Sequence, residues 1–172
     1  MRHVVWRVTA SLLLMVTLLS CHDVNDERLP AMPVNIRLDN TGVWHTYGVT
    51  GYGQYRYFIL YQGIVEPADF AYPYGSATGY GGVLLISGQD AYSGEVGPLA
   101  FDLSCPVERR ADVRVEVDAE SLEAVCHECG SRYNVVAAGG VAVSGVAQAS
   151  NYGLTRYRCV PSDNGGYLIT GY

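Results

Sequence analysis

Asp112-Val113-Arg114-Val115-Glu116-Val117-Asp118 alternates without a break between charged residues and valine. Successive side chains of a β-strand point to opposite faces of the sheet, so this pattern places all three valines on one face. Valine also favours strands, because its branched side chain fits a pleated surface. The stretch therefore predicts a strand over 112–118 with one buried face and one face in water.

Short segments of the same kind follow one another along most of the chain. Each is rich in valine, isoleucine, tyrosine or phenylalanine, and turn-forming residues separate it from the next. They cover residues 34–38, 55–61, 82–86, 100–103, 122–125, 133–136, 141–144, 154–160 and 167–170. After the first twenty residues no stretch has a convincing helical period. The sequence therefore predicts an all-β domain, either an antiparallel sandwich or a small barrel.

The first twenty residues have the pattern of a targeting signal. Arg2 and Arg7 come first, and an apolar run over 8–19 follows that is too short to cross a bilayer as a helix. The run ends in Leu18-Leu19-Ser20-Cys21, which resembles the lipobox of bacterial lipoproteins. The resemblance implies removal of the signal, a lipid on Cys21 and a place in the bacterial cell envelope as an outer-membrane lipoprotein. An ordinary secretory signal that happens to end at a cysteine is the alternative.

Residues 21–33 are polar and rich in turn-forming residues, and they predict a tether. Acidic residues soon after Cys21 resemble the surface-export signals of some Bacteroidetes lipoproteins, so a periplasmic and a surface-exposed location both stay open. The remaining residues, 34–172, have the length of one domain with its own core.

The charge of the chain restricts its partners. It contains no lysine, and two of its 11 basic residues lie in the signal, which leaves nine arginines against 17 acidic residues. An acidic surface without a basic stripe argues against binding of nucleic acid or of anionic lipid headgroups. We therefore expect attachment to the membrane through the lipid on Cys21, and a protein partner in the envelope that the sequence does not identify.

Three further cysteines lie in two short loops. Cys105 follows the apolar end of the segment 100–103, and Cys126 and Cys129 follow the segment 122–125. Strand ends hold side chains rigidly, and Gly130 lets the backbone turn so that its amides face the sulfurs. We expect the three sulfurs to converge between neighbouring loops.

The second loop, Cys126-His127-Glu128-Cys129-Gly130-Ser131-Arg132-Tyr133, resembles the second box of Rieske iron-sulfur proteins, Cys-x-x-His-Gly-Ser-x-Phe/Tyr. Residues 139–147 are similar to the strand and loop that cover the cluster in that family, and the spacing of Cys105 from Cys126 matches the family's two boxes. The resemblance implies a Rieske-like β-sandwich with a small loop subdomain that holds a two-iron two-sulfur cluster for electron transfer. It also implies that Ser131 and Tyr133 donate hydrogen bonds to the sulfurs.

The ligand set departs from that family. Rieske centres bind two irons through two cysteines and two histidines. Here the first-box histidine position is Val107, the second-box histidine position is Cys129, and the cysteine of the family's bracing disulfide is Glu128. A centre with two histidine ligands is therefore not expected, and the cofactor is either altered or lost.

Three interpretations of the cysteines remain open. In the first, Cys105, Cys126 and Cys129 bind zinc or an altered iron-sulfur cluster, with Glu108 or His127 as the fourth ligand. The second interpretation is a metal-free binding or structural module held by a disulfide.

For that disulfide the resemblance favours Cys105 with Cys126, and a Cys126–Cys129 bridge is the alternative; Cys159 reads as a buried apolar residue. In the third interpretation the tyrosine-rich stretch 44–80 binds a glycan. No pattern of catalytic residues occurs, so an electron carrier or binding module is expected rather than an enzyme.

Overall fold

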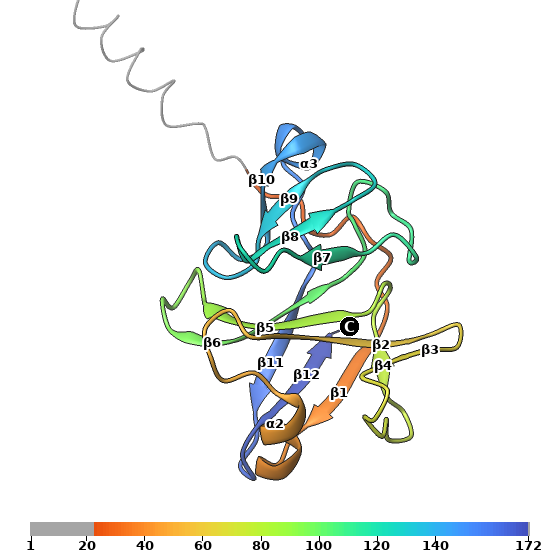
Figure 1. Ribbon diagram of the computed structural model, residues 1–172, viewed down its shortest axis with the longest axis vertical. Helices are drawn as coiled ribbons and strands as arrows, with labels where there is room; N and C mark the ends of the chain where they lie inside the picture. The colour runs from red at the N-terminus through yellow and green to blue at the C-terminus, as the bar shows by residue number, and fades with distance from the viewer. Residues whose placement is uncertain (1–22, 172) are drawn as a thin grey trace, which may run out of the picture.

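A computed structural model of the chain describes residues 23–171, which form two antiparallel β-sheets stacked one above the other (Figure 1). The prediction of an all-β fold is confirmed. The predicted signal and Cys21 lie outside the described residues. Within the described residues, no helix is long and apolar enough to span a membrane.

The larger sheet has eight strands and curls. Its order is β3 (Ile64–Glu66), β2 (Tyr55–Tyr61), β5 (Val83–Gln89), β6 (Val96–Asp102), β11 (Arg156–Pro161), β12 (Tyr167–Gly171), β1 (Val34–Leu38) and β4 (Ala77–Thr78). Although β2 and β4 lie near opposite ends of this order, the Leu60 N–H donates to Thr78 Oγ1 at 3.1 Å. The sheet therefore wraps an apolar interior of its own.

The smaller sheet is inserted in the sequence between β6 and β11. Its order is β10 (Val141–Ser144), β9 (Arg132–Asn134), β8 (Glu123–Cys126) and β7 (Val115–Val117). In Figure 1 it lies above β5 and β6 of the larger sheet, with the short helix α3 (Gly145–Ala149) at its far end. The cysteine loops of the sequence therefore belong to one small substructure and its junction with β6.

Strand β5 lies between two apolar cores. Val83 and Leu85 pack into the interior of the curled sheet, while Leu84 and Ile86 pack into the core between the two sheets. All four side chains are fully buried. A strand buried on both faces requires a continuous apolar run, which is what this segment has.

The alternating stretch behaves as predicted over part of its length. Val115 and Val117 are buried and Glu116 is exposed, but the strand covers only 115–117. Val113 is half-buried in the preceding loop, where its carbonyl accepts from the Cys105 N–H at 3.0 Å. Residues 115–117 therefore pair with β8, whereas Val113 bonds to the first cysteine loop.

Both helices were missing from the prediction. Helix α2 (Thr41–Tyr47) begins where the Asn40 side chain accepts from the Val43 N–H at 3.0 Å, and it ends at Gly48. A Cβ at Gly48 would lie 2.4 Å from the Trp44 ring, so the helix end requires glycine there. Val43, Trp44 and Tyr47 share one face of α2 and pack half-buried against the core inside the curled sheet, but seven residues are too few to show a helical period in the sequence.

Part of the segment 21–33, predicted to be a tether, contacts the domain. Asn25 forms a parallel bridge with Tyr152, and Arg28 Nε donates to the Pro106 carbonyl at 3.0 Å. The Arg28 guanidinium also lies 3.8 Å from the centre of the Tyr152 ring. The chain therefore runs along the small sheet, beside the first cysteine loop, before it enters β1.

Candidate metal centre

The first cysteine loop is anchored by a buried carboxylate at the end of β6. Asp102 is fully buried and accepts four hydrogen bonds, whose donors are the N–H groups of Tyr80 (2.8 Å), Gly81 (3.0 Å) and Ser104 (2.7 Å) and the Tyr157 hydroxyl (2.6 Å). Burial raises the pKa of Asp102, against the lowering effect of these donors. Asp102 was not among the predicted site residues, although an acid that ends an apolar strand just before Cys105 is a recognisable sign of a structural role.

Backbone hydrogen bonds fix the turn that carries Cys105. The Arg109 N–H donates to the Cys105 carbonyl at 2.9 Å and closes the loop. Arg109 has a φ of 55°, in the left-handed region that few residues other than glycine adopt. The sulfur of Cys105 is thereby directed into the core between the sheets, where the residue is fully buried.

The second loop forms a tight knuckle around two sulfurs. The Gly130 N–H donates to the Cys126 carbonyl at 2.9 Å, the Cys126 N–H donates to the Ser131 carbonyl at 2.9 Å, and Gly130 has a φ of 70°. Backbone amides face the sulfurs: those of Glu128 and Cys129 favour the ionised form of Cys126, and that of Ser131 favours ionised Cys129. Such amides stabilise negative charge on sulfur, as a thiolate ligand needs.

The three sulfurs of Cys105, Cys126 and Cys129 lie within 4.8 Å of one another. Cys105 Sγ and Cys129 Sγ are 3.6 Å apart. Two thiolates on a tetrahedral zinc ion, each with a bond of about 2.3 Å, have sulfurs about 3.8 Å apart. The spacing therefore fits a single metal ion bound between the loops.

The thiols differ in acidity. Burial raises the pKa of Cys126 to about 12. Burial also opposes ionisation of Cys129, but hydrogen bonds from Ser131 outweigh it and lower the pKa of this thiol. The pKa of Cys129 therefore lies below that of Cys126, and Cys129 is also the most exposed of the three cysteines.

Ser131 and Tyr133 lie beside the sulfurs, as the resemblance implies. Ser131 Oγ accepts from the Ala147 N–H at 3.1 Å and from the Cys129 thiol at 3.3 Å; once that thiol is ionised, the Ser131 hydroxyl is free to donate to it. The Tyr133 hydroxyl is 3.5 Å from Cys105 Sγ, and burial raises the pKa of this phenol, so it stays protonated. Both side chains can donate to a thiolate.

Helix α3 covers the centre. Ala147 is fully buried in the same core as Cys105, Cys126 and Tyr133. The helix starts at Gly145, where φ is 80° and a Cβ would lie 2.8 Å from Ser131 Cα. The stretch 139–147 is thus placed over the second cysteine loop, which explains why glycine stands at this close approach.

The two candidates for a fourth ligand do not join the three sulfurs. His127 Nε2 lies 3.3 Å from Glu116 Oε2, and its side chain is 71% exposed. Glu108 is half-buried in the first loop and is not part of the group that could hold an ion. Among the described residues, a metal would therefore have three cysteine ligands and no histidine, which does not fit a Rieske cluster with two histidine ligands.

The fourth described cysteine lies elsewhere. Cys159, on β11, packs against the core inside the curled sheet, and burial raises its pKa to about 12. All four described cysteines are free thiols. The disulfide between Cys105 and Cys126 stays a prediction, and Cys129 is the sulfur found within 3.6 Å of Cys105.

The tyrosine-rich stretch 44–80 contributes largely to packing. Tyr47, Phe58, Phe70 and Tyr72 form a chain of edge-to-face ring contacts, with ring centres 4.7 to 5.4 Å apart. Tyr74 is the clear exception, since its side chain is fully exposed. Glycan binding by this stretch stays a prediction.

No family model, curated protein sequence or solved structure matches this chain.

The chemistry that the site can perform follows from its three thiol groups. Three converging thiols bind soft or borderline metal ions such as zinc and iron, and two of them can alternatively be oxidised to a disulfide.

Proposed function

We propose that this chain is a lipid-anchored protein of the bacterial cell envelope whose small sheet holds a metal centre through Cys105, Cys126 and Cys129. The observation that carries the proposal is the convergence of these three sulfurs within 4.8 Å, on two loops that are each fixed by backbone hydrogen bonds. The expected lipid on Cys21 would hold the domain at the membrane.

A metal accounts for more of the site than a disulfide does. A disulfide would use two of the three sulfurs and leave the third as a free thiol. Cys159 cannot pair with that thiol, because it packs against the other core. A cation uses all three sulfurs and offsets the cost of burying thiolate charge. The amides and hydroxyls that face the sulfurs favour ionised thiols, which a metal needs and a disulfide does not.

The identity of the metal decides the activity. An iron centre with thiolate ligands would carry one electron, as the resemblance to Rieske proteins implies, and its potential would be lower than that of a centre with histidine ligands. Zinc would instead stabilise the loops without redox chemistry. In either case Ser131 and Tyr133 would donate hydrogen bonds to the sulfurs and withdraw charge from them.

Metal analysis of the anaerobically purified mature chain tests the proposal. We expect about one metal ion per chain by elemental analysis, or about two irons if a cluster is bound, with visible absorption bands only for iron. Cys129→Ser should lower the metal content severalfold. Cys159→Ser is the matched control, because this thiol lies outside the group, and it should leave the metal content unchanged.

A different outcome would reject the metal centre. Protein that contains no metal under anaerobic conditions, and that loses two thiols reversibly on exposure to air, would be a disulfide-stabilised module. Equal metal content in wild type and Cys129→Ser would place the ion elsewhere.

A further inference from the structure

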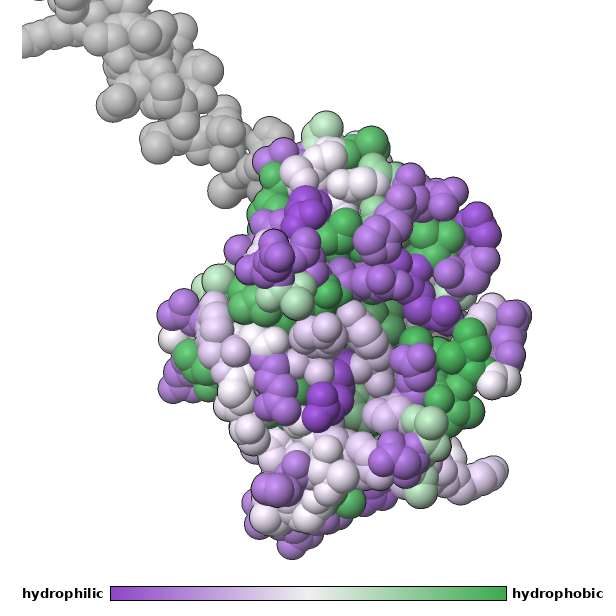
Figure 2. All heavy atoms as spheres, in the orientation of Figure 1, coloured by the Kyte–Doolittle hydropathy of each residue, from purple (hydrophilic) through white to green (hydrophobic). Residues whose placement is uncertain are grey.

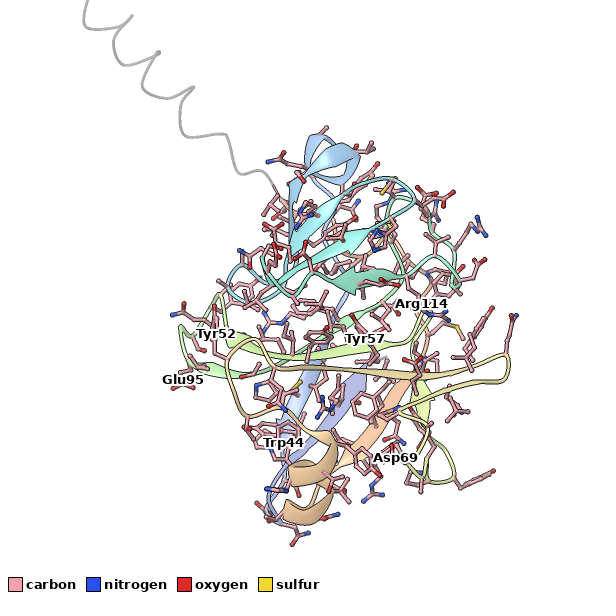
Figure 3. All side chains as sticks on the ribbon, in the orientation of Figure 1. Trp44, Tyr52, Tyr57, Asp69, Glu95 and Arg114 are labelled. Atoms are coloured by element: carbon pink, nitrogen blue, oxygen red, sulfur yellow. The ribbon has the colours of Figure 1, made fainter. Side chains whose placement is uncertain are left out.

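A groove of about 640 Å³ lies between the two sheets, beside the second cysteine loop. Residues of β2 and β3 form one wall, and the other comes from the segment 112–117 with His127 and Glu128. Figure 3 shows Tyr57 and Arg114 in the space between β7 and β2. The volume lies within the range of ligand-binding pockets in proteins.

The groove has an apolar floor and an acidic rim. The floor consists of Ile59, Leu103, Val115 and Val117, and the acids at the rim are Glu66, Asp112, Glu116 and Glu128. Asp112 pairs with Arg110, and Glu116 with His127. Only Arg114 contributes a permanent positive charge to the lining, so the groove carries a net negative charge at neutral pH.

The Arg114 guanidinium has an unused donor. Its Nε donates to the Gly81 carbonyl, and its Nη2 is buried without a hydrogen-bond partner among the described residues. Buried donors of this kind are rare in native proteins and require an explanation. That nitrogen has almost no accessible surface, so an acceptor from a ligand would reach it only after the Arg114 side chain turns toward the groove.

The β2–β3 hairpin exposes apolar side chains on both of its faces, one of them at the edge of the groove. Ile64 is 42% exposed and lines the groove, whereas Leu60 and Val65, each 41% exposed and paired across the hairpin, point to its other face. In Figure 2 this hairpin forms a hydrophobic edge beside the hydrophilic surface of the small sheet. Because Ile64 carries the apolar lining to the exposed edge of an elongated groove between two sheets, the site fits an extended protein segment better than an isolated small molecule.

We propose that this groove binds a basic, partly apolar segment of a partner protein. Arginine or lysine side chains would meet Glu66, Glu116 and Glu128, and their aliphatic stems would lie on Tyr55 and Tyr57. The acids would also steer the partner toward the groove at low salt. A partner bound there would lie directly beside the loop of Cys126 and Cys129. The proposal does not depend on whether that loop holds a metal.

Binding of a labelled peptide tests this site. The probe is a fluorescein-labelled peptide of three Arg-Leu-Gly repeats, with three Glu-Leu-Gly repeats as its acidic counterpart, measured by anisotropy at about 20 mM and 300 mM salt. We expect the mature chain to bind the basic peptide only, and more weakly at high salt. The double variant Glu66→Gln/Glu116→Gln should weaken binding about tenfold.

Matched controls separate the groove from general charge attraction. Glu95→Gln/Glu120→Gln removes two exposed acids outside the groove, and Figure 3 shows Glu95 far from Arg114. It should change the affinity less than twofold. Ile64→Asn should weaken binding, whereas Val160→Asn, at an equally exposed valine on β11, should not.

Three results would overturn the proposal. They are no binding of the basic peptide at low salt, equal losses in the groove and control variants, and self-association of the chain that the groove variants abolish. The last would make a second copy of this chain the occupant. Binding that persists in Cys129→Ser would show that the groove works without the metal centre.

Discussion

Replacing the carboxylate at the end of β6 should destabilise the domain and loosen the first cysteine loop. In Asp102→Asn one of the two carboxylate oxygens becomes an NH2 group, which donates and does not accept. Oδ1 accepts from Gly81 and Ser104, and Oδ2 accepts from Tyr80, Tyr157 and, at 3.3 Å, also from Gly81. Either orientation of the amide therefore removes the acceptor of at least one backbone N–H.

With the oxygen at Oδ2 the Ser104 N–H alone loses its acceptor, and with the oxygen at Oδ1 the Tyr80 N–H and the Tyr157 hydroxyl lose theirs. In the second orientation the Tyr157 hydroxyl can rotate to accept from the new amide, and the Tyr80 N–H alone then loses its acceptor. An unsatisfied N–H of this kind costs about 1–3 kcal/mol, and part of that is offset because the buried charge is removed. We expect the free energy of unfolding to fall by about 2 kcal/mol.

Urea unfolding of both proteins at pH 7, followed by circular dichroism, measures this loss. Asp163→Asn, at an exposed aspartate in the β11–β12 turn, is the control and should change stability by less than about 0.5 kcal/mol. Metal content measured in parallel should also fall in Asp102→Asn, since this carboxylate holds Ser104, the residue directly before Cys105. Stability equal to that of the control would refute the role assigned to Asp102.

Three further outcomes are expected. Tyr57→Phe removes the hydroxyl that accepts from the Val117 N–H at 2.8 Å and joins the two sheets. The free energy of unfolding in urea should fall by about 1–2 kcal/mol, and an unchanged midpoint would contradict the contribution of this contact. Backbone N–H groups of the following turn and Arg156 lower the pKa of Asp90. An acid whose pKa is lower in the folded state stabilises the fold at pH values above its ordinary pKa, and this stabilisation is lost as the pH falls. Acid unfolding of Asp90→Asn should therefore be less steep below pH 4 than that of the wild type. Because burial raises the pKa of Cys126 to about 12, zinc binding at pH 7 should release at least one proton, which calorimetry in two buffers of different ionisation enthalpy measures.

Patterns confined to one segment could be predicted from the sequence. The alternation of valine with charged residues locates β7, and the glycine after Cys129 locates the knuckle, because both depend on neighbours in the chain. Helix α2 could not be predicted, since its half-buried Val43, Trp44 and Tyr47 stand in a run of only seven residues, too short to show a helical period. Nor could the fourth-ligand role be decided for His127, whose sequence neighbours are cysteines but whose ring faces Glu116 on the adjacent strand.

The groove shows a stronger limit of the same kind. Its acids come from β3, from the loop before β7, from β7 itself and from the second cysteine loop. Each is an ordinary surface residue in its own segment, and only the stacking of the two sheets brings them to one rim. The signal for this site is therefore absent from any local pattern of residues.

The placement of the cysteines links the proposed metal to the stability of the whole domain. Cys105 sits on a loop anchored to the larger sheet through Asp102, whereas Cys126 and Cys129 sit at the end of β8 in the smaller sheet. A metal bound by all three sulfurs would therefore join the two sheets. It binds only when both loops are folded, so its binding free energy would add to the stability of their packing. Chelation should accordingly lower the unfolding midpoint of wild type and of Cys159→Ser alike, and leave that of Cys129→Ser unchanged.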